Sequence, residues 1–213
     1  MPLRIAIILL LIVTVPAVAQ RKPSWDAGAE KILIQSEMER YRARTMLAQR
    51  ATLADDNYDV TWYELRLRIS TNPNQVSGVV AIRAASVIDG LSSVRIDLSD
   101  SMSVDSIISA NGALSYTRAS NMVTVYLDSS YMAGEIFTIH VAYHGLPKSS
   151  GFGSFAFSVT GQGAPWIWSL SQPYGAKDWW PCKDQLPDKA DSVDVIVTCD
   201  STLRVGSNGT LAG

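Results

Sequence analysis

A strict two-residue alternation over residues 58–70 is the feature that most constrains the fold of this chain. In the stretch YDVTWYELRLRIS, Leu65 and Leu67 point to one side of an extended backbone, whereas Arg66 and Arg68 point to the other. A helix cannot separate these residues in this way, because its side chains repeat about every 3.6 residues. The alternation therefore predicts a β-strand with one buried face and one exposed face.

Six further stretches, rich in β-branched and apolar residues, also read as strands. They are VSGVVAIRAAS (76–86), SVRIDLS (93–99), MSVDSIISA (102–110), MVTVYLD (122–128), EIFTIHVAYHG (135–145) and DSVDVIVTCD (191–200). The strands before residue 146 follow one another closely, with an Asn-Gly turn at Asn111 and no helical segment between them. This order predicts a mainly β fold, either an antiparallel β-sandwich or a large curved sheet.

Residues 1–19 have the pattern of a secretory signal peptide. A single early charge at Arg4 is followed by an apolar run over residues 5–13 and by the small-residue sequence AVA, which ends at Ala19. The apolar run is shorter than the roughly 20 residues that a membrane-spanning helix needs. We therefore expect cleavage after Ala19, a secreted or periplasmic protein, and no stable membrane insertion after cleavage.

Residues 20–56 form a predicted N-terminal extension, whose main element is a helix over residues 25–53. Ile34, Met38 and Tyr41 recur at helical spacing and give this helix one apolar stripe, while its opposite face is charged. We expect the helix to lie on the main domain. Binding to a partner or to a membrane surface is the alternative.

Composition and histidine spacing argue against several function classes. The chain has 18 basic and 20 acidic residues, a formal net charge of −2, so we expect no nucleic-acid surface. His140 and His144 are the only histidines. On a strand they would lie roughly 13 Å apart, too far to share one zinc ion. No nucleophile and base stand in a recognisable motif, so we expect no metal ligands and no catalytic residues in this chain.

Cys182 and Cys199 are the only cysteines. In an exported protein they could form a disulfide. A buried free thiol is the simpler interpretation, because Cys199 continues the apolar face of the last predicted strand.

Residues 146–190 break the strand pattern, and we predict an irregular loop with a functional role. Its many aromatic residues argue against disorder. Four tryptophans are expected to anchor the loop by burying apolar area, namely Trp166, Trp168, Trp179 and Trp180. Lys177 is expected to form a structural ion pair. Asp184 is expected to stabilise the loop, either by accepting backbone hydrogen bonds or by pairing with a base.

The strands and this loop occur in a recognisable order, NYDVTWYELRLRIS, VSGVVAIRAAS, FTIHVAYHGLP, WSLSQPYGAKDWWPCKDQLPDKADSVDVIVT and VGSNGTL. In that order the chain resembles the amino-terminal β domain of the aminopeptidase N-type zinc metallopeptidases, the gluzincin aminopeptidases. The resemblance covers residues 57–213. Its most specific part is the spacing of Gln172, Lys177, Pro181, Cys182 and Asp184.

Three departures from the family pattern lie in the same loop. Leu170 stands where the family often has a second glutamine. Lys177 stands where arginine is usual, so the bidentate guanidinium is lost. The segment PCKDQLP differs from the common family sequence at Lys183, Gln185 and Leu186.

The resemblance implies a saddle-shaped β-sandwich that packs on a helical catalytic domain. That domain, which would follow Gly213, carries the zinc ligands of the family, so Zn²⁺ would belong to the full-length enzyme and not to this chain. The resemblance also implies that Gln172 lies beside the N-terminal residue of a peptide substrate, flanked by Pro173 and Tyr174. These are the predicted substrate-binding residues.

The function that follows is the amino-terminal fragment of a secreted zinc metallo-aminopeptidase, inactive on its own. An Asn-Gly hairpin turn at Asn208 has only four residues after Gly209, which predicts that the β domain is truncated at its C-terminal end. Two alternatives remain. One is a free-standing secreted β-sandwich that binds a ligand without catalysis, and the other is a non-enzymatic scaffold relative.

Overall fold

The computed structural model describes Met38, Tyr41 and residues 56–148, 154–171, 174–185 and 187–211. The predicted signal peptide lies outside these residues, as does most of the predicted helix over residues 25–53. Met38 and Tyr41 are helical and half exposed. The chain divides into two units, residues 1–38 and 39–213, and the fold below is that of the second. Among the described residues we found no helix with the length and apolar character of a membrane span.

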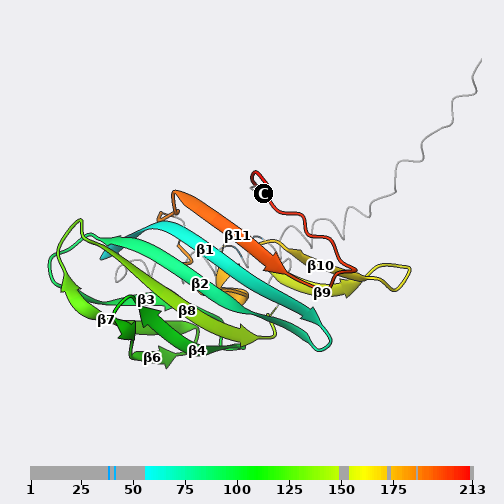
Figure 1. Ribbon diagram of the computed structural model, residues 1–213, viewed down its shortest axis with the longest axis horizontal. Coiled ribbons are helices and arrows are strands. Elements are labelled where there is room, and N and C mark those ends of the chain that lie inside the picture. The colour runs from blue at the N-terminus through cyan, green and yellow to red at the C-terminus, as the bar shows by residue number, and fades with distance from the viewer. Residues whose placement is uncertain are drawn as a thin grey trace, which may run out of the picture. The chain divides into compact units, whose positions relative to one another are not determined.

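From residue 56 onward, the regular elements among the described residues are strands and one short 3-10 helix. The strands are β1 (Tyr58–Thr71), β2 (Asn74–Ser86), β3 (Leu91–Asp97), β4 (Met102–Ser109), β5 (Gly112–Ala113), β6 (Tyr116–Ala119), β7 (Met122–Tyr131), β8 (Ile136–Gly145), β9 (Phe155–Val159), β10 (Pro165–Ser169) and β11 (Ser192–Thr198), and the helix is η1 (Ala176–Asp178). The predicted mainly β fold is confirmed (Figure 1).

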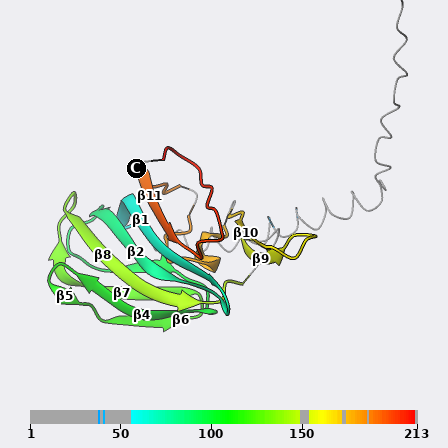
Figure 2. The same ribbon diagram turned by 45° about the vertical axis from the view of Figure 1, so that its right-hand side comes forward.

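Two facing sheets make up the body of the domain. The larger sheet has the order β11-β1-β2-β8-β4-β5, the smaller has the order β3-β7-β6, and β9 and β10 form a separate hairpin. Figures 1 and 2 show the larger sheet curving until β4 lies beside the smaller sheet. Contacts join the two there, since Tyr116 donates to the carbonyl of Val104 at 3.3 Å and Arg118 donates to that of Met102 at 2.5 Å. The domain is thus a curved β-sandwich.

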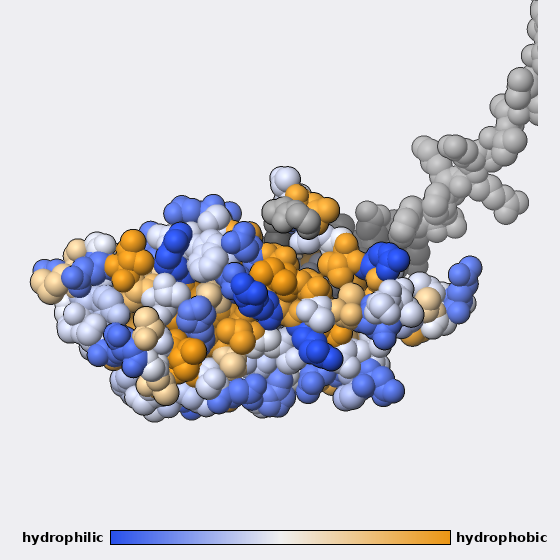
Figure 3. Space-filling model, in the orientation of Figure 1, coloured by the Kyte–Doolittle hydropathy of each residue, from blue (hydrophilic) through white to orange (hydrophobic). Residues whose placement is uncertain are grey.

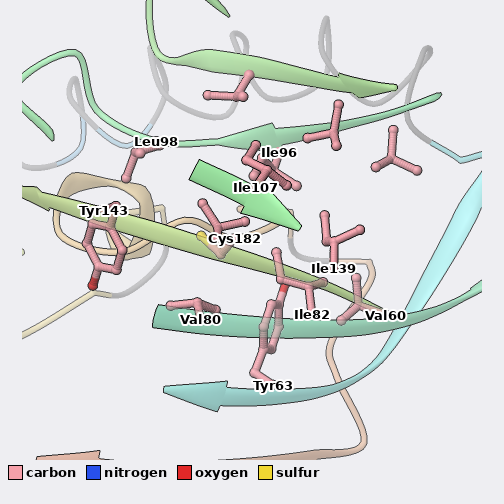
Figure 4. Packing of buried hydrophobic residues seen from close by; sticks show 14 of the residues in the cluster. Val60, Tyr63, Val80, Ile82, Ile96, Leu98, Ile107, Ile139, Tyr143 and Cys182 are labelled. Atoms are coloured by element: carbon pink, nitrogen blue, oxygen red, sulfur yellow. The ribbon is translucent and has the colours of Figure 1, made fainter. Parts of the chain in front are cut away.

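The core lies between the sheets. As the alternation in β1 predicted, every second side chain of that strand over residues 63–67 points into the core. Leu65 and Leu67 are buried, whereas Arg66 and Arg68 are exposed. Figure 4 shows Val80 of β2 and Ile139 of β8 on the same side of the larger sheet, within the buried cluster. The smaller sheet closes the core from its own side with residues that are 3% exposed or less, among them Val94, Ile96, Val123 and Val125.

One strand direction differs from the antiparallel prediction, because β11 runs parallel to β1. Its register pairs Trp62 with Ser192 and Arg68 with Thr198. Parallel pairing needs a long crossover, and residues 170–191 provide it by returning the chain to the beginning of β1. There the N–H of Asp191 donates to the carbonyl of Thr61 at 3.1 Å.

β11 is an apolar edge strand of the larger sheet. Val193 and Val195 pair with core residues of β1, yet they are 53% and 40% exposed. Ile196, on the other face, is 42% exposed. Figure 3 shows hydrophobic residues along this part of the surface. The edge of β11 away from β1 has no strand partner among the described residues.

Part of the predicted irregular segment is a regular hairpin, which corrects the sequence interpretation. β9 and β10 pair antiparallel, from Phe155 opposite Ser169 to Val159 opposite Pro165. The missed signal is two short runs of aromatic and β-branched residues on either side of the glycine-rich turn TGQGA. Trp166 is 60% exposed in this hairpin, so the prediction that it anchors the loop by burial is wrong.

Candidate functional site

The candidate site is the loop between β10 and β11, residues 170–191. Of the three predicted substrate-binding residues, Gln172 and Pro173 lie outside the described residues. Tyr174 is described and is 8% exposed. Burial is the main cause that raises the pKa of its phenol, which therefore stays neutral at physiological pH. The structure thus places one of the three residues, together with Ser171 and Gly175 on either side of the segment.

Two tryptophans anchor this loop to the core, as predicted. The ring of Trp180 meets that of Tyr63 edge-on, with the centroids 5.0 Å apart. The ring of Trp179 lies 5.0 Å from that of Phe155 in β9. The indole N–H of Trp179 also donates to the hydroxyl of Ser171 at 2.9 Å. Trp179 therefore holds the residue that directly precedes Gln172.

The two sides of the Gln172-Pro173 dipeptide are tied to each other and to the hairpin. The N–H of Gly175 donates to the carbonyl of Ser171 at 2.8 Å. Gly175 packs so closely that an added Cβ would lie 3.0 Å from Ser154. Ser154, just before β9, donates its hydroxyl to the buried carboxylate of Asp178 in η1. Tight packing and a buried polar bond thus hold both flanks of the dipeptide.

Lys177 forms the structural ion pair that the sequence predicted, and its partner, which the sequence did not identify, is Asp184. Nζ lies 2.6 Å from Oδ2, and the two side chains are 27% and 6% exposed. Burial acts to lower the pKa of Lys177, but the neighbouring Asp184 carboxylate outweighs burial and raises it. The N–H of Asp184 also donates to Asp97 at the end of β3, at 3.0 Å. The pair therefore ties the loop to itself and to the smaller sheet.

Cys182 joins the loop to β3 from inside the core. Its backbone exchanges two hydrogen bonds with Asp97, at 2.7 and 3.0 Å. Its side chain lies among the core residues in Figure 4 and is 2% exposed. Burial raises the pKa of this thiol well above its usual value, so it stays protonated and unreactive. Cys182 and Cys199 are both free thiols, but only Cys182 is buried, so the simpler interpretation is confirmed in full for Cys182 and only in part for Cys199.

A buried lysine also attaches the loop to the larger sheet. The sequence analysis did not predict this role. Lys183 is 7% exposed, and its ammonium donates to the carbonyl of Tyr58 at 2.6 Å and to the carboxylate of Asp188. The same ammonium lies 4.3 Å from the centroid of the Tyr58 ring. The backbone N–H of Lys183 donates to the hydroxyl of Tyr63 at 3.0 Å. Lys183 and Asp188 thus fasten the loop to the beginning of β1. We call this pair the Lys183 clasp.

The described residues do not fit a zinc site. No group of three histidine, cysteine or acidic residues is placed there to hold a metal ion. His144 points its Nδ1 at Asp105, 2.7 Å away, in an exposed pair. His140 lies opposite Ala81 of β2 and Ile108 of β4, neither of which offers a ligand. No step of a reaction is therefore assigned to a metal held by this part of the chain.

The loop and both sheets belong to one known domain type. The family model described as "Peptidase M1 N-terminal domain" matches residues 57–212. This chain is a member of that family. The model covers the β-sandwich, the loop between β10 and β11, and the segment that follows β11.

Solved structures of M1 zinc metallopeptidases share the fold. A mutant of a two-domain M1 zinc metallopeptidase bound to L-arginine is 25% identical, with a TM-score of 0.59 over 68% of this chain and 33% of that one. The M1 zinc metallopeptidase from Deinococcus radiodurans is 23% identical, with a TM-score of 0.54 over 67% and 33%. Native leukotriene A4 hydrolase from Saccharomyces cerevisiae is 16% identical, with a TM-score of 0.58 over 68% and 24%.

The M1 N-terminal domain described here spans a third or less of the length of these enzymes. A search of curated protein sequences gave no match.

Proposed function

We propose that this domain is the amino-terminal part of a secreted zinc metallo-aminopeptidase and forms a wall of its substrate cleft. The observation that carries the proposal is the frame around Gln172 and Pro173. Ser171 is held by Trp179, Gly175 is packed on Ser154, and the following part of the loop is fixed by one buried and one partly buried ion pair. A family loop fixed so firmly on both sides of one dipeptide is suited to presenting a side chain.

Gln172 is the residue we assign to the substrate. Its amide carbonyl can accept a hydrogen bond from the α-ammonium group of a peptide, and its NH₂ can donate to a backbone carbonyl. Related M1 structures were solved with L-arginine, with L-tryptophan and with a Tyr-Ser-Ala substrate, which supports peptides as the substrate class. Zinc would be bound by the catalytic domain of the full-length enzyme, and this chain contributes binding and orientation only.

The test uses the native protein, isolated with an antibody raised against this domain. We expect it to hydrolyse an L-leucyl amide substrate and not the N-acetylated form, because the acetyl group removes the ammonium that Gln172 recognises. A native protein that cleaves neither substrate, or both equally, contradicts the proposal. Edman sequencing of the same sample checks export, and a first residue of Gln20 is the expected result.

The Gln172→Ala variant of the native protein tests the residue itself. A hydrogen bond to a charged group contributes about 1.5–3 kcal/mol, so kcat/KM for the free-amine substrate should fall roughly 10- to 150-fold. Leu170→Ala, two residues away and 45% exposed, is the matched control and should stay close to the wild type. An equal loss in both variants would mean that the loop, and not the amide of Gln172, is what matters.

The exposed Trp166 supports the alternative of a secreted binding module without catalysis. An indole that is 60% exposed on the β9–β10 hairpin can stack on a ligand. In that case the native protein would cleave neither substrate, and Trp166→Ala would abolish ligand binding while leaving the fold intact.

A further inference from the structure

A polar cleft lies at the far end of β1, away from the loop. Its volume is about 220 Å³, and it opens between the last residues of β1 and the residues that follow β11. The loop contacts β1 at Tyr58 and Tyr63, whereas the cleft begins at Arg68. The cleft is therefore separate from the site assigned to Gln172.

Arg68 gives the cleft an open positive group. Its guanidinium makes no hydrogen bond or ion pair with any residue in the described part of the chain. Arg66, two residues earlier on the same face, is instead paired with Glu64 at 2.5 Å. The strand register places Arg68 beside Thr198 of β11, and Thr198 and Thr71 line the cleft with hydroxyl groups. A carboxylate could therefore be bound here by a guanidinium and neighbouring hydroxyls.

Asp200 gives the same cleft an open negative group. Its Oδ1 accepts the N–H of Thr202 at 2.9 Å and the hydroxyl of Thr202 at 2.7 Å. These two bonds lower the pKa of Asp200, so the carboxylate is charged at neutral pH. Its Oδ2 accepts no hydrogen bond within the described residues. Asp200 can thus receive a bond from an ammonium group.

The presence of one positive and one negative group in the same cleft indicates the class of ligand. Asp200 disfavours a simple anion, and Arg68 disfavours a simple cation, because each would meet a like charge. Arg68 and Asp200 line one cleft without forming an ion pair with each other, so a ligand that carries both charges can satisfy both. Ile69 and Cys199 also line the cleft and contribute apolar surface to it. The volume lies below the roughly 300–1,000 Å³ of sites for drug-sized ligands and suits a smaller molecule.

We propose that this cleft binds a free α-amino acid with an apolar side chain, with its carboxylate on Arg68 and its ammonium on Asp200. The proposal stands on the cleft alone and does not depend on the peptidase activity assigned above. Its failure would leave the role of Gln172 untouched.

The test is a ¹⁵N NMR titration of the 213-residue chain with L-leucine. We expect saturable shifts at the backbone amides of Thr71 and Asp200, with a dissociation constant in the millimolar range. N-acetyl-L-leucine lacks the ammonium and L-leucinamide lacks the carboxylate. Each should bind at least roughly tenfold more weakly, because one charge-assisted contact is lost. Absence of a saturable shift with L-leucine, or equal shifts with all three compounds, overturns the proposal.

Substitutions at the two exposed charged residues test which charged group of the ligand each residue binds. Arg68→Gln should remove the preference for L-leucine over L-leucinamide, and Asp200→Asn should remove the preference for L-leucine over N-acetyl-L-leucine. Arg66→Gln is the matched control, since its guanidinium is already engaged by Glu64, and it should bind L-leucine like the wild type. If Arg66→Gln weakens binding as much as Arg68→Gln, general surface charge explains the effect and the proposed site is wrong.

Discussion

At the scale of single residues, the Lys183 clasp shows how one unusual side chain is accommodated in the core. A lysine ammonium is costly to bury, and here the Asp188 carboxylate, the carbonyl of Tyr58 and the face of the Tyr58 ring replace the water it loses. The sequence offered no periodic signal for this arrangement. Lys183 stood out only as a departure from the family pattern, and its partners lie 5 and 125 residues away along the chain.

Removing the ammonium of Lys183 should therefore destabilise the folded domain. We expect Lys183→Met to lower the free energy of unfolding by about 3 kcal/mol, because it leaves the Asp188 carboxylate, which is 10% exposed, without its cationic partner and removes the donor to the carbonyl of Tyr58. The control is Lys148→Met, whose partner Asp100 and own side chain are 58% and 62% exposed, and which should cost less than about 1 kcal/mol. Urea denaturation followed by tryptophan fluorescence measures both. Similar midpoints for the two variants would show that the clasp adds little.

At the scale of elements, a surface carboxylate joins the turn between β4 and β5 to β7. Asp128 accepts bonds from the hydroxyl of Ser109 at 2.7 Å, from the side-chain amide of Asn111 at 2.8 Å and from the hydroxyl of Tyr131 at 2.8 Å. The Ser109 bond is the largest cause that lowers the pKa of Asp128 below its usual range. Asp128 thus stabilises the folded state in its charged form, and this contribution is lost as pH falls through the lowered pKa.

A pH series tests this attachment. Asp128→Asn should lower the free energy of unfolding by about 1 kcal/mol at neutral pH, a modest value because the carboxylate is exposed. The difference from the wild type should begin to shrink near the ordinary aspartate pKa of about 3.9 and vanish only when the pH lies below the lowered pKa of Asp128. Ser109→Ala should reproduce part of the same pH dependence. A difference that is as large at pH 3 as at pH 7, measured by thermal unfolding, would rule out the charge as its cause.

The sequence predicts those features of a strand that depend on neighbouring residues in the chain, and not those that depend on distant contacts. The alternation of β1, with Leu65 inside and Arg66 outside, predicts its two faces correctly because each side chain obeys its own position on the pleat. The direction of β11 could not be read in this way. It is set by where residues 170–191 return the chain, and that depends on contacts such as Trp180 on Tyr63, which join distant parts of the sequence. An ion pair at Lys177 and a stabilising role for Asp184 were predicted from one short segment, but that the two residues pair with each other came only from the structure.

At the scale of the whole molecule, the described residues contain no group of three histidine, cysteine or acidic residues placed to hold a metal ion. We expect the 213-residue chain alone to hydrolyse no aminoacyl amide and to bind no zinc at a one-to-one ratio. Its thermal midpoint should be the same with and without a chelator, because metal contributes to stability only where ligands hold it. The native protein should lose its activity in chelator. A histidine-dependent, stoichiometric zinc titration of the chain would contradict this expectation.

The edge of β11 away from β1, which has no strand partner among the described residues, affects how this polypeptide behaves in a cell. An apolar strand with free backbone donors and acceptors is a template onto which identical strands can add without limit. Every moment during synthesis in which that edge is uncovered exposes the chain to fibrillar aggregation. Chaperones that bind extended apolar segments, and proteases that clear such species, should therefore act on β11 first.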